Sequence, residues 1–283
     1  MADLAHDTSV VTTDRAESFT HFTADISAEW AIWGPMGGYI ASIALRAAGE
    51  HCGRARPASI NANFLAAAAF APVTVQATTL RTTRVATCVR VTVVQDERPV
   101  IEATVWGTDT TDGLEHHTTR RAPDVPHHST LPSFHERLAA QDEAVMYEFW
   151  NRLDFRPTEW TDDWMNRAPT EPAQSSWYRF VDGPRFDEPW LDDTRLLILT
   201  DLDAWGAATN AHTGELAWFA PTIELTCRFL QPAHEYEWLL SWGDAPVGRA
   251  GLIGVESEVW SEDHRLLAIG GSTLLCRPAP TES

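Results

Sequence analysis

Gly34-Pro35-Met36-Gly37-Gly38-Tyr39 leads directly into Ile40-Ala41-Ser42-Ile43-Ala44-Leu45-Arg46-Ala47-Ala48, and this stretch decides how the chain folds. The residues from Tyr39 to Ala48 are mostly small or good helix formers, which predicts a helix. The small side chains let this helix lie close against a sheet. The glycines at its start leave backbone N–H groups unobstructed, an arrangement that stabilises an anion or an oxyanion.

After this helix, apolar residues alternate with polar ones, which is the period of a half-buried strand. The alternation is clear in residues 59–65, 73–78 and 89–93, and an apolar run over 100–106 follows the turn-like segment 96–99. One helix followed by several long strands indicates an α+β layer, in which a curved antiparallel sheet wraps the helix.

The second half of the chain repeats this order of elements. We expect a short strand over 176–182 and a helical region over 190–208, then strands at 222–229, 237–242, 251–260 and 266–276. The match predicts an internal duplication at the scale of a domain. The predicted division is an N-terminal unit over 1–107, a connector over 108–175 with a short helix within 131–150, and a C-terminal unit over 176–283.

Composition narrows the classes of partner. The 283 residues, with 44% hydrophobic and 22% charged side chains, are typical of about two globular units. The net charge of −19 argues against nucleic acid as a main partner. A phosphorylated ligand is still compatible with a local cluster of arginines, although such residues can equally form a solvated strand face. The candidates are Arg54, Arg56, Arg81, Arg84 and Arg90.

Neither a targeting segment nor a membrane span is predicted. Residues 1–20 are polar and acidic, unlike a secretory signal, and no run of about 18 apolar residues occurs. The four cysteines have neither the spacing of a zinc site nor that of a disulfide framework. We therefore expect a cytoplasmic protein with reduced thiols and no membrane partner. The cysteines are Cys52, Cys88, Cys227 and Cys276.

No metal or other cofactor is expected. The histidine pairs His116-His117 and His127-His128, with His135 nearby, fall in the connector, and no carboxylate stands at the spacing of a helical metal motif. The Gly-x-Ser-x-Gly motif of serine hydrolases is also absent from the sequence.

Four segments, taken in order, resemble the thioesterase-like double hot-dog superfamily related to acyl-CoA thioesterase II. They are residues 33–39 with the helix that follows, Asp154-Phe155-Arg156-Pro157, Thr222-Ile223-Glu224-Leu225 with Phe229 and Pro232, and Glu237-Trp238-Leu239-Leu240. The resemblance covers about residues 19–277. It implies an α+β double hot-dog fold, with two tandem helix-wrapped units whose antiparallel sheets join into one continuous sheet.

The resemblance also implies a catalytic set. In that family, an Asp at the second helix, a Thr on the following strand and a Gln on the last strand hold and activate the water that attacks a thioester. Asp201 stands at the Asp position and Thr222 at the Thr position, and Ser272 stands by spacing where the family has glutamine. The backbone amides of Gly37, Gly38 and Tyr39 would contact the substrate and its oxyanion.

Structural explanations compete with each of these roles. Asp201 can be an ordinary helix carboxylate and has a rival in Asp203, while Thr222 can be a β-favouring residue at the start of a strand. The pair Gly37-Gly38 can simply allow close helix packing.

The chain has thirteen tryptophans, which fill either an aromatic acyl pocket or an ordinary core. Those near the candidate site in sequence are Trp30, Trp33, Trp205 and Trp218.

The sequence thus predicts a hydrolase acting on an acyl-CoA or acyl-carrier thioester through Asp201-activated water. Two alternatives remain: a non-hydrolytic acyl-binding protein, and a hot-dog enzyme with an altered reaction such as dehydration. Hydratase relatives pair an acid with a histidine, and the histidine nearest to a matching spacing after Asp201, His212, lies too far along the chain, which makes the altered reaction the weaker alternative. Exposed sheet edges favour a homo-oligomer.

Overall fold

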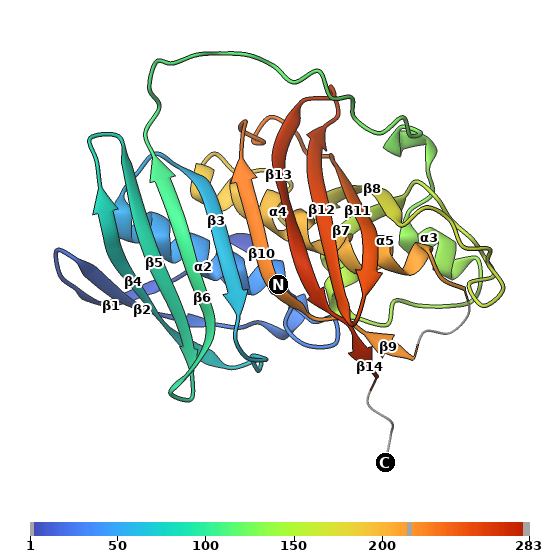
Figure 1. The fold of residues 1–283 in the computed structure, drawn as a ribbon, viewed down its shortest axis with the longest axis horizontal. Helices are drawn as coiled ribbons and strands as arrows, with labels where there is room; N and C mark the ends of the chain where they lie inside the picture. The colour runs from blue at the N-terminus through green and yellow to red at the C-terminus, as the bar shows by residue number, and fades with distance from the viewer. Residues whose placement is uncertain (1–2, 214–216, 280–283) are drawn as a thin grey trace.

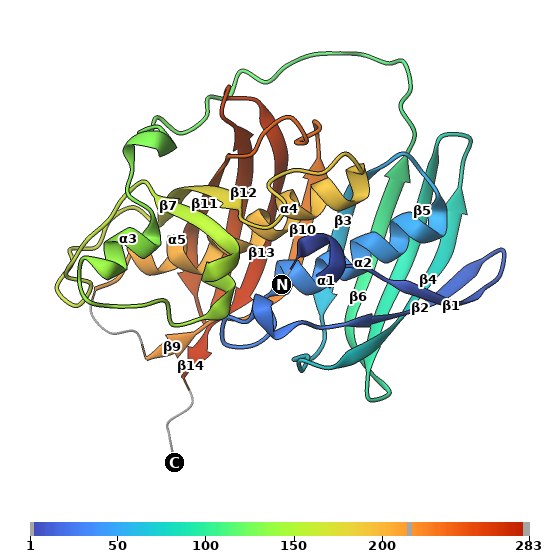
Figure 2. The same cartoon turned by 180° about the vertical axis from the view of Figure 1, so that it is seen from behind.

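The computed structural model describes residues 3–213 and 217–279, which form one twelve-stranded antiparallel sheet with two long helices on one of its faces (Figure 1). The strand order is β1-β2-β4-β5-β6-β3-β10-β13-β12-β11-β8-β7. Seen from behind, the helices α2 and α4 cross the middle of the sheet side by side (Figure 2). The expected α+β double hot-dog fold with a continuous sheet is confirmed.

The N-terminal half of the sheet surrounds α2. A short helix α1 and a single 3-10 turn η1 pack beside it. The elements are α1 (Leu4–Asp7), β1 (Val11–Arg15), β2 (Phe19–Asp25), η1 (Ala28–Trp30), α2 (Gly37–Cys52), β3 (Arg56–Phe64), β4 (Pro72–Thr82), β5 (Ala86–Gln95) and β6 (Arg98–Thr108).

The C-terminal half repeats this plan around α4, and its order β8-β11-β12-β13-β10 matches β2-β4-β5-β6-β3. The elements are β7 (Leu153–Pro157), β8 (Ala173–Phe180), α4 (Pro189–Leu202), α5 (Ala204–Asn210), β10 (Thr222–Phe229), β11 (Leu239–Arg249), β12 (Leu252–Ser261) and β13 (Leu266–Leu275), with β9 (Trp218–Phe219) and β14 (Arg277–Pro278) forming a small separate ladder.

The two halves join where β3 pairs antiparallel with β10. Asn61 lies opposite Thr226 and Ala62 lies opposite Leu225 in this ladder. Because the same strand of each unit forms the junction, the units are related by an approximate two-fold axis that passes through it.

The connector contains more strand than expected. Beyond η2 (His128–Thr130), α3 (Phe134–Ala139) and η3 (Glu148–Arg152), it supplies β7, which pairs with β8. Alternate residues of β7 are buried, which is the reason that this five-residue segment joins the sheet. Strand β8 also begins at Ala173, before the predicted boundary at residue 176.

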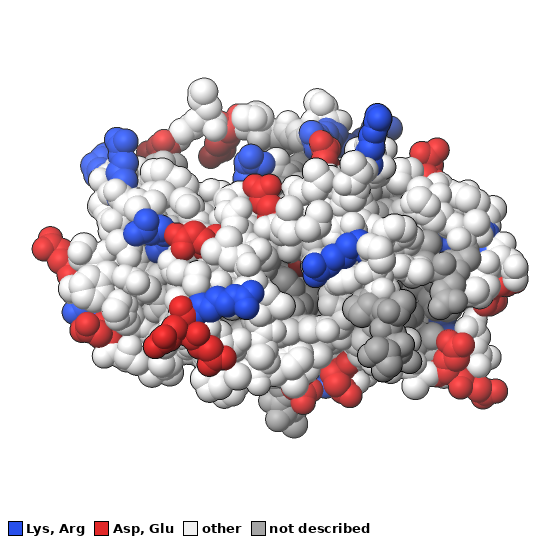
Figure 3. Space-filling model, turned by 60° about the horizontal axis from the view of Figure 1, so that its bottom comes forward, with Lys and Arg blue, Asp and Glu red and all other residues white. Residues whose placement is uncertain are grey.

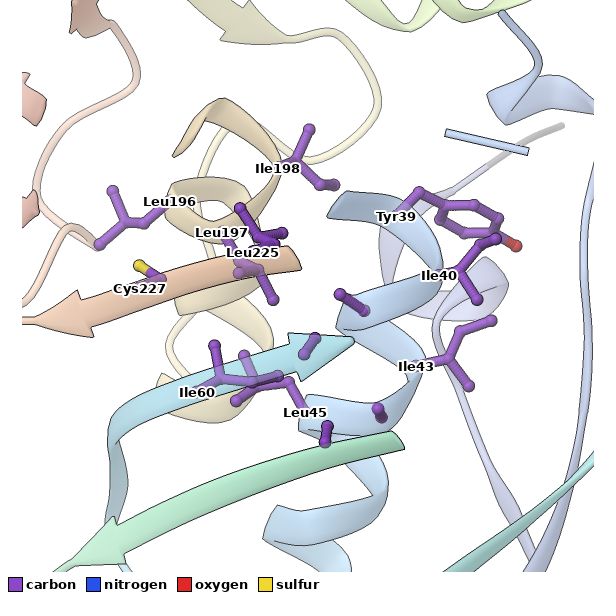
Figure 4. Packing of buried hydrophobic residues seen from close by; sticks show 14 of the residues in the cluster. Tyr39, Ile40, Ile43, Leu45, Ile60, Leu196, Leu197, Ile198, Leu225 and Cys227 are labelled. Atoms are coloured by element: carbon purple, nitrogen blue, oxygen red, sulfur yellow. The ribbon is translucent and has the colours of Figure 1, made fainter. Parts of the chain in front are cut away.

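The core lies between the sheet and the two helices (Figure 4). Helix α2 presents Ile43 and Leu45 to it, and α4 presents Leu197, all without exposed surface. The helices approach so closely that a Cβ on Gly38 would lie 2.8 Å from the Cα of Ile198. Helix α2 ends at Cys52 and is capped by Gly53, whose φ of 60° is a left-handed conformation that favours glycine. None of the described helices is long and apolar enough to cross a membrane.

Candidate active site

Asp201 lies in the last turn of α4 and is only 9% exposed. Its two carboxylate oxygens have different partners. The Thr222 hydroxyl donates to Oδ1 at 2.8 Å, and the backbone N–H of Gly38 donates to Oδ2 at 2.9 Å. The carboxylate is therefore held from both sides, by the first residue of β10 and by the first turn of α2.

Gly37 makes this approach possible. A Cβ at this position would lie 2.7 Å from Asp201 Oδ2 and 3.3 Å from a ring carbon of Phe64, so a larger residue would displace the carboxylate. The positive end of the α2 dipole also points at Asp201, which favours its negative charge.

Burial raises the pKa of the Asp201 carboxyl above its ordinary value. The hydrogen bonds from Thr222 and Gly38 oppose this shift because they stabilise the ionised form. A raised pKa makes the carboxylate a stronger base than an exposed aspartate, as general-base catalysis requires.

A cavity of about 1260 Å³ opens beside this carboxylate. Residues 32–37 and 64–68 of the N-terminal half form one wall, and residues 201–206 and 219–223 of the C-terminal half form another. The connector closes a third side. Several large aromatic side chains belong to the lining, among them Trp33, Phe134, Trp150, Trp160, Trp164, Trp205 and Phe219.

Ser272 does not line this cavity. It lies on β13 opposite Leu225 and Val255, is 5% exposed, and its hydroxyl has no hydrogen-bond partner among the described residues. The β13 residues that reach the cavity are Leu274, which is the sheet neighbour of Thr222, and Leu275. The structure therefore brings Asp201 and Thr222 together without a hydrogen bond to Ser272.

The amides expected to hold an oxyanion are mostly engaged. The Gly38 N–H is bonded to Asp201, and the Tyr39 N–H points to the Met36 sulfur at 3.2 Å. The Tyr39 ring is fully buried, and its hydroxyl is bonded to backbone groups of the N-terminal segment. Of the three predicted residues, Gly37 alone lines the cavity.

Asp203 lines the same cavity but has different surroundings. Its carboxylate accepts hydrogen bonds from Tyr178 and Gln174 and has none from the first turn of α2. Of Asp201 and Asp203, Asp201 alone is bonded to a threonine hydroxyl and to a backbone N–H of α2.

The Asp201 site lies between the start of α2 and the end of α4. The approximate two-fold axis relates it to an equivalent position between the start of α4 and the end of α2. Trp190 fills it. Its indole is 5% exposed, lies against the Cα positions of Gly49 and Gly107, and donates through Nε1 to the Arg54 carbonyl at 2.7 Å. The duplicated scaffold therefore has one open site and one closed by tryptophan.

The other candidate residues lie outside the cavity lining. None of the five arginines considered for a phosphate lines it, and Arg54 is bonded to Asp109 and to the backbone of the β4–β5 turn. Arg167 and Arg277 line it instead. Figure 3 shows acidic and basic side chains interleaved over one face of the molecule. Of the tryptophans near the site in sequence, Trp33 and Trp205 line the cavity, whereas Trp30 is buried in the core.

Among the histidine pairs, His127 and His128 lie near Glu262, with their ligand atoms within 4.8 Å of one another. His128 Nε2 is 2.7 Å from the Glu262 carboxylate, and its ring stacks on Trp238. Burial lowers the pKa of His128, so these contacts are those of a packed, hydrogen-bonded imidazole, and the absence of a metal stays a prediction.

Sequence reasoning overlooked the contribution of the connector to the cavity. Its aromatic residues, such as Trp160 and Trp164, meet the two halves only in the folded chain. The unusual number of aromatic residues in this otherwise polar connector is the sequence signal that could have revealed its place in the cavity wall.

Comparisons with known proteins agree with this architecture. The N-terminal domain of acyl-CoA thioesterases matches residues 26–108, and the C-terminal domain of the same enzymes matches residues 122–272. No curated protein matches the chain.

Two solved structures illustrate the fold. A conserved protein with a hot-dog fold from Alicyclobacillus acidocaldarius has a TM-score of 0.78 and 22% identity, covering 98% of each chain. An acyl-CoA thioesterase II from Mycobacterium marinum has a TM-score of 0.76 and 19% identity, covering 98% of this chain and 99% of its own. Since the two family domains together match most of the sequence, the chain belongs to the acyl-CoA thioesterase family.

Proposed function

We propose that this protein hydrolyses an acyl thioester, carried by coenzyme A or by an acyl-carrier protein, with a water activated by Asp201. The observation that carries the proposal is the buried Asp201 carboxylate, held by Thr222 and Gly38 at the wall of a large apolar cavity. Membership of the acyl-CoA thioesterase family supports thioester hydrolysis in general.

In the proposed reaction, Asp201 takes a proton from water while the water oxygen attacks the thioester carbonyl carbon. The carbonyl π electrons move to the oxygen, which becomes an oxyanion. When the oxyanion collapses, the carbon–sulfur bond breaks, and the proton held by Asp201 passes to the thiolate. The products are a carboxylic acid and a free thiol.

Thr222 positions the base in this scheme. Its hydroxyl proton is donated to Asp201, so the Thr222 oxygen keeps lone pairs that can accept a hydrogen bond from the same water. The water would then sit between two acceptors, with its own lone pair directed at the carbonyl carbon.

The oxyanion is assigned to the backbone N–H of Gly37. The amides of Gly38 and Tyr39 already have partners, and no partner is found for the Gly37 N–H within residues 3–213 and 217–279. This group lies at a helix start, where N–H donors and the helix dipole both favour negative charge. Removal of one such donor typically costs about a hundredfold in rate or more.

A non-hydrolytic acyl-binding protein is the second candidate. The observation that favours it is the apolar character of β13 beside Thr222, where Leu274 and Leu275 reach the cavity in place of a polar side chain. A water held only by Asp201 and Thr222 would be less firmly oriented.

The cavity supports a bulky, largely apolar acyl group. Drug-sized ligands occupy cavities of roughly 300–1,000 Å³, so about 1260 Å³ accommodates an acyl group with part of its carrier. Arg167 and Arg277 in the lining are the groups that we assign to the carrier phosphates. Homo-oligomerisation and a cytoplasmic location stay predictions.

Release of free thiol from a panel of acyl-CoA substrates tests the proposal. The panel should include straight-chain, branched and aromatic acyl groups. Saturable turnover of at least one member is expected. Saturable binding of the same substrates with no thiol release would replace the proposal by the acyl-binding alternative.

A further inference from the structure

Five aromatic side chains of the connector form a continuous row along the cavity wall. Their rings all line the cavity, and they belong to Phe134, Trp150, Phe155, Trp160 and Trp164. The ring centroid of Phe134 lies 5.1 Å from that of Phe155 and 5.5 Å from that of Trp150. It also lies 5.9 Å from Trp160, which in turn contacts Trp164 at 5.7 Å. These separations are those of attractive ring pairs, so the aromatic row is one packed unit.

The aromatic row leads from the surface into the molecule. Trp164 is 46% exposed, whereas Phe155 is 7% exposed. Phe134 and Trp150 lie between these extremes and are partly buried. Because these two rings line the cavity and keep exposed surface, a ligand inside the cavity can reach them.

The inner end of the aromatic row lies near the proposed base. Phe155 stacks on Tyr178, with ring centroids 5.0 Å apart and the ring planes 11° from parallel. The Tyr178 hydroxyl donates to Asp203 at 2.6 Å, and Asp203 follows Asp201 by two residues. An acyl group whose carbonyl carbon lies at Asp201 is therefore close to the inner rings.

The connector is fixed beside the segment that leads into α2. The Phe149 N–H donates to the Ala31 carbonyl at 3.2 Å, and the Phe149 ring packs edge-on against Trp30 at 6.0 Å. Trp150 follows Phe149 directly and stacks on Phe155 at 5.0 Å. The rings that face the cavity are thus held in position before any ligand binds.

Aliphatic side chains of the first turns of α2 complete this part of the lining. Met36 and Ile40 are each 5% exposed and line the cavity. They lie four residues apart, as does one turn of a helix, so they share a face. The inner part of the cavity is therefore walled by fixed rings and by apolar chains.

We propose that this inner part binds an aromatic acyl group, and that Trp150 and Phe134 select it over a saturated acyl group of the same size. Contact between two aromatic rings contributes beyond the burial of apolar area, and a saturated group lacks this contribution. Because the protein rings are already ordered, little conformational freedom is lost when they bind. This inference rests on the proposed function and names the acyl class of its substrate.

A carboxylate at the end of the acyl group fits this part less well. It would leave water for apolar surroundings, and it would approach the carboxylates of Asp201 and Asp203. The favoured acyl group is therefore both aromatic and uncharged.

Binding of coenzyme A thioethers, which cannot be hydrolysed, tests the inference without requiring turnover. Two thioether analogues are compared, with 2-phenylethyl or 2-cyclohexylethyl on the sulfur, so that both substituents have the same carbon skeleton. Burial of apolar area alone favours the cyclohexyl ring, which carries more hydrogens and more surface. Contact with the aromatic row should reverse this order, so the wild type should bind the phenylethyl analogue roughly two- to tenfold more tightly.

Trp150→Leu removes one ring of the row and keeps an apolar side chain. The preference for phenyl over cyclohexyl should fall by about twofold or more. Trp106→Leu is the matched control, since Trp106 is 36% exposed and lies outside the cavity lining. It should keep the preference of the wild type. Phe134→Leu is the second variant if Trp150→Leu does not fold, and it should lower the preference in the same way.

Equal or tighter binding of the cyclohexylethyl analogue by the wild type overturns the inference, as does a lack of saturable binding of both analogues. An unchanged preference in a folded Trp150→Leu or Phe134→Leu variant also overturns it, and so does an equal fall in Trp106→Leu. Because these measurements use binding alone, failure of the proposed hydrolysis would be seen separately, as a lack of thiol release.

Discussion

The backbone N–H of Gly38 donates to Asp201 Oδ2 at 2.9 Å, across 163 residues of sequence. The first turn of one duplicated helix thus holds the carboxylate carried by the last turn of the other. Neither half of the chain contains this arrangement alone, so duplication and fusion of the hot-dog unit produce one asymmetric site.

Replacement of Thr222 by valine tests the hydrogen bond to Asp201. The threonine hydroxyl lowers the pKa of Asp201, so its loss should raise that pKa further. Because the base must be ionised, the acidic limb of the kcat/KM profile should move to higher pH, with the largest loss of activity at low pH. An acidic limb at the wild-type position would show that Thr222 does not act on the base.

Gly37→Ala tests the close contact at the helix start. The new Cβ falls 2.7 Å from Asp201 Oδ2, so the carboxylate must move. A displacement of this kind costs up to roughly a hundredfold in kcat/KM. Gly254→Ala is the control, since its Cβ meets no atom within 4 Å. Equal activity of the two variants would show that the close contact at Gly37 does not fix the position of Asp201.

Trp190→Ala tests the closed, symmetry-related place. Removal of this buried indole and its bond to Arg54 should lower the free energy of unfolding by about 3–5 kcal/mol. Trp218→Ala, at a residue that is 50% exposed, should change it little. Calorimetric titration with a thioether analogue should still give one site per folded chain. Two sites per chain in the wild type would refute the assignment of a single open site.

The stability of Asp203→Asn should depend on pH. Burial raises the pKa of Asp203 from 3.8 to about 6 in the folded state. The contribution of Asp203 to the free energy of unfolding therefore falls as the pH rises from about 4 to 6, and the loss persists above that range. Asparagine does not ionise, so its stability relative to the wild type should increase with pH, by up to about 3 kcal/mol. Denaturant unfolding at pH 4 and pH 8 measures the difference, and a constant difference would contradict the raised pKa.

Much of the fold follows from local pattern. The alternation that begins at Thr222 gives β10 its observed bounds, Thr222–Phe229, and the small residues after Tyr39 lie in α2. The duplication predicted two similar units, and the family resemblance implied that their sheets join into one. The strand β7 was overlooked because its alternation is only five residues long and stands within a polar connector, and its pairing with β8 arises from tertiary contacts.

The site was less accessible to sequence reasoning. Along a strand, neighbouring residues face opposite sides and successive ones move 3.3 Å, so spacing alone cannot separate Ser272 from Leu275. The engagement of the Gly38 amide depends on Asp201, which is remote in sequence. The bonds of Asp203 come from Gln174 and Tyr178 on β8, which no local motif connects to it.

The most direct test of the central claim is the rate of thioester hydrolysis by Asp201→Asn, measured on the best substrate of the panel. Asparagine keeps the shape of the side chain but cannot take a proton from water. We expect kcat to fall by at least about a hundredfold, with binding of the thioether analogue retained. Hydrolysis by a folded Asp201→Asn variant at the wild-type rate would contradict the assignment of Asp201 as the base.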